Sequence, residues 1–218
     1  MRKNSQTLTT QSIPALIKQL AIPASIGMFF NTMYNVVDTF YAGLISTQAI
    51  SALTLSFMIF FLIIGFGYGF SSAITALLGN ALGKKRYKLA SIYAHKGLIF
   101  VPLIGLTLSI IGYFFAPSLF MFLGAKDEYL QISLDYINPI LFGAIFFMFN
   151  FSLNSILVAT GDTKTYRNSL IFGFFANLAL NPLFMYGFLF VPAMGIKGIA
   201  FATVLIQIIN MFYLFYKV

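Results

Sequence analysis

Residues 49–79 read AISALTLSFMIFFLIIGFGYGFSSAITALLG and contain no Asp, Glu, Lys, Arg or His. A helix needs about 20 consecutive apolar residues to cross a bilayer, so this stretch is long enough by itself. Similar runs recur along the 218 residues, of which 60% are hydrophobic and only 8% are charged. A soluble domain carries about 25% charged residues. The sequence therefore predicts an all-α, polytopic integral membrane protein and excludes a water-soluble globule.

Short breaks rich in Gly, Asp, Asn, Pro and Lys separate the hydrophobic segments. Several segments exceed the minimum spanning length, which indicates tilted helices that project beyond the lipid. The polar residues 1–11 lack the apolar core of a cleaved signal peptide, so we expect the first helix to direct insertion. We predict a single domain over residues 1–218, with six transmembrane helices roughly at 14–45, 49–79, 97–123, 129–160, 167–190 and 197–217.

The positive charges fall almost entirely on one side of the predicted helices. The chain has 13 Lys and Arg against 5 Asp and Glu, a net charge of +8. Because cytoplasmic loops are enriched in Lys and Arg, we place both termini in the cytoplasm and the helices in the cell (inner or plasma) membrane. The other side then carries only Lys126 and Lys197. The cytoplasmic side carries Arg2, Lys3, Lys18, Lys84, Lys85, Arg86, Lys88, Lys96, Lys164, Arg167 and Lys217.

The densest group of these charges is residues 84–96, KKRYKLASIYAHK. We expect this segment to run along the inner membrane surface before the third helix, with its charges against anionic lipid headgroups. Membrane sidedness accounts for these residues, so we expect membrane lipid as a partner and no nucleic acid.

One face of the first segment is polar. Asn31, Asn35 and Asp38 recur at i, i+4 and i+7, with Tyr34 beside them. Asp38 is the only acidic residue well inside a predicted span. A carboxylate in the membrane is a candidate for function, because it can bind and release a proton or coordinate Na⁺ with hard oxygen ligands. The alternative is a buried Asp that only hydrogen-bonds a neighbouring helix.

The fifth and sixth segments carry similar polar stripes. Asn177 and Asn181 share one face of the fifth, and Thr203, Gln207 and Asn210 share one face of the sixth. The rise of 1.5 Å per residue places Asn181 and Thr203 in the outer half of the membrane, at the depth of Asp38. These groups are therefore candidates for a cation or proton site, although Asn stripes also join helices without further function.

Two further features concern helix contacts and bending. Asn150 and Asn154 lie nearer the inner end of the fourth segment, where we interpret them as helix–helix contacts. Pro23 lies fifteen residues before Asp38 in the same segment and removes a backbone hydrogen bond, so we interpret it as a hinge coupled to Asp38. The chain has no Cys and a single His, His95, at an interface, so we expect no enzyme, no cofactor and no tightly bound metal.

Five stretches together resemble one known family. They are IPASIGMFFNTMYNVVDTFYAGLI (22–45), GNALGKKRYKLA (79–90), ATGDTKTYRNS (159–169), NLALNPLFMYG (177–187) and GIKGIAFATVLIQ (195–207). In this order the chain resembles the N-terminal lobe of MATE (multidrug and toxic compound extrusion) transporters. The resemblance implies two six-helix lobes around a central cleft, and export of drugs or metabolites driven by Na⁺ or H⁺.

The resemblance also implies roles for particular residues. Family members use an Asp on helix one, an Asn and an Asp on helix five and a Thr on helix six, which match Asp38, Asn177, position 181 and Thr203. Position 181 is Asn here. One carboxylate fewer weakens a Na⁺ site and favours H⁺ over a transient Na⁺ at Asp38. We expect Asn31, Tyr34, Asn35 and Gln207 to line the cavity.

The length matches only half of that architecture, so we expect an N-terminal lobe whose C-terminal lobe is absent from the chain. A second copy of the chain is the alternative partner. We expect an organic cation or a neutral small molecule as substrate, because the polar face carries Asn, Tyr, Thr and one Asp. The alternatives are a lipid-linked precursor flippase, whose cleft would carry basic residues, and a non-transporting six-helix assembly module.

Overall fold

A computed structural model describes residues 11–188 and 190–218 as an all-helical protein. All six of its helices are long and apolar enough to span a membrane. The predicted fold class of six transmembrane helices is confirmed. In chain order the helices are α2 (Ile13–Ile45), α3 (Thr47–Gly83), α4 (Tyr87–Phe122), α5 (Asp127–Ala159), α6 (Lys164–Tyr186) and α7 (Ile196–Lys217).

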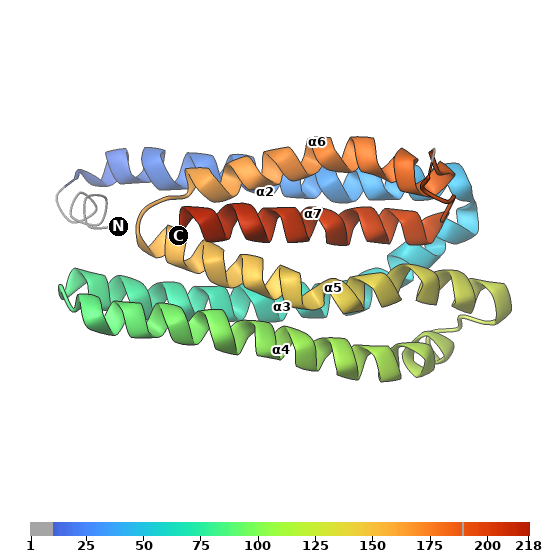
Figure 1. The fold of residues 1–218 in the computed structure, drawn as a ribbon, viewed down its shortest axis with the longest axis horizontal. Coiled ribbons are helices and arrows are strands. Elements are labelled where there is room, and N and C mark those ends of the chain that lie inside the picture. Colours follow the sequence, from blue (N-terminus) through green and yellow to red (C-terminus); the bar gives the residue numbers. More distant parts are fainter. Residues whose placement is uncertain (1–10, 189) are drawn as a thin grey trace.

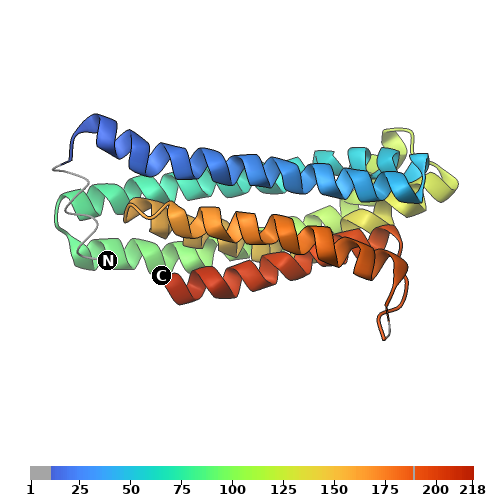
Figure 2. The same cartoon turned by 90° about the horizontal axis from the view of Figure 1, so that it is seen from above.

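The helices lie side by side along one axis, and the chain reverses direction at each turn (Figures 1 and 2). α2, α6 and α7 form one group, and α3, α4 and α5 form the other. The two groups meet chiefly where α5 packs against α7. α5 is the most buried helix, so the core of the lobe follows its length.

Local chemistry sets the ends of the helices. α4 and α5 are followed by Gly124 and Gly161, whose φ values of +95° and +86° favour glycine. The side chain of Ser46 accepts a hydrogen bond of 3.0 Å from the backbone N–H of Ala49 at the start of α3. At the start of α6, Asp162 Oδ1 accepts bonds of 3.0 Å from the backbone N–H groups of Lys164 and Thr165. The breaks in the sequence are therefore tight turns.

The alternating direction brings the α3–α4 turn, the α5–α6 turn and the end of α7 to one end of the lobe (Figure 1). We call this the basic end, because it carries Lys84, Lys85, Arg86, Lys164 and Lys217. Lys126 and Lys197 lie at the opposite end. Arg2 and Lys3 lie outside the described residues, as does the N-terminus. The cytoplasmic orientation of this end stays a prediction.

The prediction for the third span was wrong at its start. α4 begins at Tyr87 and not at residue 97, so residues 87–96 are its first turns and not a separate segment along the membrane surface. Nothing between Arg86 and Gly97 breaks a helix, and Lys, Leu and Ala favour one. The other ends lie within four residues of their predicted positions.

Candidate functional site

Asp38 lies near the end of α2 that is opposite to the basic end, and only 2% of its surface is exposed. Its Oδ1 accepts hydrogen bonds from Asn177 Nδ2 at 2.8 Å and from Asn181 Nδ2 at 2.9 Å, both on α6. Its Oδ2 accepts a bond of 3.2 Å from the hydroxyl of Thr203 on α7. Helix α2 and the two last helices of the chain, α6 and α7, therefore meet at one carboxylate. The structure brings together all four residues predicted to bind a cation or proton.

The two amides are fully buried and also contact one another, since Asn181 Nδ2 donates to Asn177 Oδ1 at 3.2 Å. Their spacing of one helical turn makes this contact possible. The pair presents N–H groups to Asp38, so Asp38 receives donors only. Neutral donors of this kind stabilise a buried negative charge in part.

No basic side chain among the described residues forms an ion pair with Asp38; the ion pair found in this part of the chain joins Lys197 and Asp135 at 3.2 Å. A buried charge without a counter-ion is costly, and a group in this position gains free energy by binding a proton or a cation. The described residues also contain no cluster of three or more His, Cys, Asp or Glu side chains, which a tightly held metal would use. The role of Asp38 in binding a proton or a cation stays a prediction.

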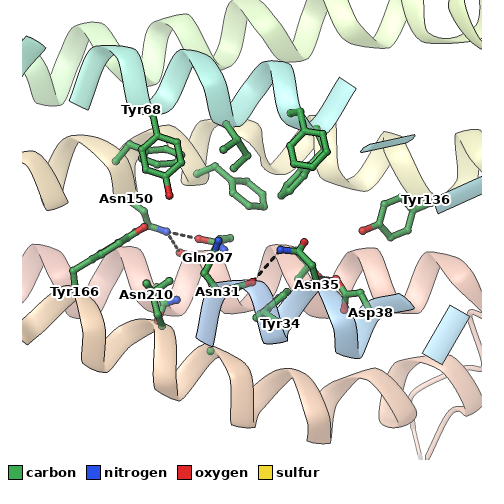
Figure 3. Close-up of a pocket in the computed structure, with 18 residues that line it drawn as sticks. Asn31, Tyr34, Asn35, Asp38, Tyr68, Tyr136, Asn150, Tyr166, Gln207 and Asn210 are labelled. Carbon is green, nitrogen blue, oxygen red and sulfur yellow. Dashed lines mark hydrogen bonds between the residues drawn. The ribbon is translucent and has the colours of Figure 1, made fainter. Parts of the chain in front are cut away.

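A cavity of about 90 Å³ extends from Asp38 between the two groups of helices (Figure 3). The four residues predicted to line a cavity, Asn31, Tyr34, Asn35 and Gln207, all line it. Asn35 Nδ2 donates to the backbone carbonyl of Asn31 at 3.0 Å, within α2. The polar face of α2 thus points into the lobe.

Several lining residues were missing from the predicted set, and the polar ones that the sequence did not single out as candidates are Tyr68, Tyr136, Tyr166 and Asn150. The tyrosines lie on three different helices in otherwise apolar or interfacial sequence, so helical periodicity alone does not select them. Asn150 does join helices, since its Nδ2 donates to Gln207 Oε1 at 2.7 Å and to the Gln207 backbone carbonyl at 3.0 Å. It also lines the cavity, a second role that the interpretation as a helix contact omitted.

Pro23 is buried inside α2, which continues through it as one helix. A proline has no N–H to donate to the carbonyl four residues earlier, here that of Gln19. That carbonyl accepts a hydrogen bond of 3.4 Å from the hydroxyl of Thr163, in the α5–α6 turn. The Gln19 carbonyl, which Pro23 leaves without its helical partner, therefore links α2 to the α5–α6 turn at the basic end. The role of Pro23 as a hinge stays a prediction.

The profile of the MatE family matches residues 23–183, which cover most of α2, all of α3 to α5 and most of α6. The chain belongs to the MatE family. This MatE chain is 30% identical to the probable multidrug resistance protein YoeA of Bacillus subtilis, over 94% of its own length and 46% of that protein. It is 26% identical to an FAD transporter of Shewanella oneidensis, over 92% of its own length and 44% of that protein.

Solved structures agree with this assignment. A crystal structure described as MATE in the bent conformation superposes on 99% of the MatE chain with a TM-score of 0.91 and 27% identity. The match covers 47% of that protein. The MatE chain thus spans about half the length of the relatives and structures that it matches.

Proposed function

We propose that the chain is the N-terminal lobe of a cation-coupled exporter and that the coupling cation binds at Asp38. The observation that supports this most directly is the buried carboxylate, which receives three neutral donors and no basic partner among the described residues. The three donors stabilise the charged form of such a group only in part, and neutralising the group changes its hydrogen bonds. A site of this kind can couple cation binding to helix movement.

A proton fits this site better than Na⁺. Na⁺ requires several oxygen ligands, whereas Asn177 and Asn181 turn their N–H groups toward Asp38. A proton requires a smaller change, because the Thr203 hydroxyl can rotate and accept a hydrogen bond from a protonated Oδ2. The two hydrogen bonds from the side-chain amides of Asn177 and Asn181 to Oδ1 would then persist. We therefore place the coupling proton on Oδ2.

In this mechanism the site opens alternately to the two sides of the membrane. A proton reaches Asp38 from the outer face, weakens the link between α2 and α7, and lets α2 move about Pro23. The movement dislodges the cargo, and loss of the proton to the cytoplasm resets the lobe. We place the basic end in the cytoplasm, because Lys and Arg favour that side. The cargo site between two lobes requires the C-terminal lobe or a second copy.

An organic cation or a neutral small molecule is the cargo that we propose. No Lys or Arg lines the cavity that contains Asp38, within the part of the chain that the structure describes. A flippase for a pyrophosphate-linked lipid would need basic residues along its cleft, and the described part of this lobe places none beside Asp38. The names of the two relatives, a multidrug resistance protein and an FAD transporter, support transport of organic molecules without selecting their charge.

The test uses the full natural protein in proteoliposomes with a fluorescent organic cation as cargo. We expect a pH gradient to drive its movement, a Na⁺ gradient at equal pH to have no effect, and Asp38→Asn to abolish movement. Asp135→Asn is the matched control, because it removes a carboxylate from the same lobe outside the site. Undiminished transport by Asp38→Asn would contradict the proposal, and it would favour a lobe with an assembly role.

A further inference from the structure

Four buried polar side-chain atoms have no hydrogen-bond partner among the described residues: Tyr34 OH, Asn150 Oδ1, Ser152 Oγ and Asn154 Oδ1. Tyr34 and Asn150 line the cavity, and Asn154 lies one helical turn beyond Asn150. A buried polar atom without a partner costs about 1–3 kcal/mol. Two such atoms in the lining of one cavity, Tyr34 OH on α2 and Asn150 Oδ1 on α5, indicate that something polar belongs in the cavity.

The size of the cavity identifies its occupant as water. Its volume is about 90 Å³, and a cavity needs roughly 10–15 Å³ of such volume to hold one water molecule. The cavity therefore has room for several water molecules, whereas a drug-sized ligand needs a pocket of at least about 300 Å³. Each water also needs two to four polar partners. The amides, phenols and carboxylate of the lining meet that requirement.

The cavity has a direction along the membrane axis. Asp38 and Tyr136 lie toward one side of Figure 3, and Asn150, Asn210 and Tyr166 lie toward the other. Tyr166 is the third residue of α6, next to Arg167 at the basic end. The polar lining therefore runs from Asp38 toward that end.

An apolar cluster lies beyond the cavity on this side. Leu153, Leu157 and Leu214 are buried together, and Tyr166 and Met211 pack against them. Apolar side chains without polar atoms interrupt a chain of hydrogen-bonded water. This cluster therefore closes the cavity toward the basic end.

We propose that water molecules in this cavity form the proton path between Asp38 and Tyr166, and that the Leu153–Leu157–Leu214 cluster closes it until the lobe rearranges. Each water accepts one proton and passes on another, so Asp38 alone ends with a changed charge. The proton path rests on the proposed function, whereas the presence of water in the cavity is independent of it.

Few other groups compete for the proton along this path. The titratable side chains that line the cavity are Tyr34 on α2, Tyr68 on α3, Tyr136 on α5 and Tyr166 on α6. α7 contributes Thr203, Gln207 and Asn210, which do not titrate, and α4 contributes no lining residue. Lys, Arg, His and Glu are all missing from the described lining.

Asn150 and Gln207 act as positioning residues for the water chain. Asn150 uses its Nδ2 group for Gln207, which leaves Asn150 Oδ1 as an acceptor. The Nε2 group of Gln207 can also donate a hydrogen bond. A water beside Asn150 Oδ1 would donate to that oxygen, which orients the water.

Hydroxyl radicals generated by X-ray pulses oxidise side chains next to bound water, so radiolytic footprinting of the full natural protein tests the water chain. Tyr136 and Phe151 line the cavity and are only 3% and 5% exposed. Met148 and Phe120 are fully buried away from it and serve as controls, although methionine is the more reactive residue type. We expect oxidation of Tyr136 and Phe151 but not of the controls. Equal protection of all four residues would overturn the water chain.

The variant Gln207→Leu in proteoliposomes tests the path. We expect proton-driven transport to slow about tenfold, the effect of one lost hydrogen bond in the transfer step. We also expect unchanged cargo affinity and a larger solvent deuterium isotope effect, which a structural defect would not produce. Gln131→Leu is the matched control, because Gln131 is exposed and bonds Asp135. A normal transport rate in Gln207→Leu would overturn the proton path. If Asp38→Asn is inactive at the same time, the proposed function still holds.

Discussion

Asp38 is held by side chains from two other helices, and each oxygen of the carboxylate has a different kind of donor. Oδ1 faces two amides and Oδ2 faces a hydroxyl. An amide N–H can only donate, whereas a hydroxyl can donate or accept. The two oxygens are therefore not equivalent toward a proton. This asymmetry is why we favour H⁺ over Na⁺.

Asn181→Asp tests that preference at the same residue. The change gives the site a second carboxylate next to Asp38, and two carboxylates with a hydroxyl suit Na⁺. We expect the melting temperature of the variant to rise in NaCl relative to KCl, and that of the natural protein to be equal in both salts. The double variant Asp38→Asn, Asn181→Asp should lose the effect. A Na⁺-dependent rise in the natural protein would contradict the preference for protons.

At the scale of helices, two contacts control how α2 and α7 sit against α6. α2 carries Pro23, which has no N–H for the Gln19 carbonyl, and that carbonyl accepts a hydrogen bond of 3.4 Å from the Thr163 hydroxyl. α7 approaches α6 closely at Gly198, where an added Cβ would lie 2.5 Å from the carbonyl oxygen of Phe184. The backbone hydrogen bond that is missing at Pro23 is the basis of the predicted hinge, and the close approach at Gly198 fixes the position from which Thr203 reaches Asp38.

Pro23→Ala tests the bending of α2. Alanine restores an N–H for the Gln19 carbonyl and removes the steric effect of the ring, so the helix becomes stiffer. We expect an unchanged or higher melting temperature together with a severalfold loss of transport. Transport at the natural rate would argue against a hinge at this proline.

Gly198→Ala tests the approach of α7 to α6. The contact is with backbone, which cannot rotate away, so α7 must shift and we expect a loss of about 1–3 kcal/mol in stability. Gly79→Ala is the control, because no heavy atom lies within 4 Å of its added Cβ. We expect that control to be neutral or slightly stabilising. Equal melting temperatures for both variants in thermal unfolding would contradict the close packing.

At the scale of the whole molecule, the sequence predicts the six helices because hydrophobic runs and turn residues are local signals. It also places Asp38, Asn181 and Thr203 at one depth, because depth follows from residue count along alternating helices, whereas the resemblance to the MATE family joins Asn177 to them in one site. It does not predict Tyr68, Tyr136 or Tyr166 as lining residues, because that depends on which face of α3, α5 and α6 turns inward. The sequence does not reveal the early start of α4, because a cluster of positive charges fits both a segment along the membrane surface and a helix that extends beyond the membrane.

The chain spans about half the length of the proteins that it matches, and the proposed cation site at Asp38 lies wholly within it. Infrared difference spectroscopy measures proton binding at this site directly. We predict a carboxylic acid C=O band that appears as the pH is lowered, is absent from Asp38→Asn and persists in Asp135→Asn. The same band at full strength in Asp38→Asn would contradict proton binding at Asp38.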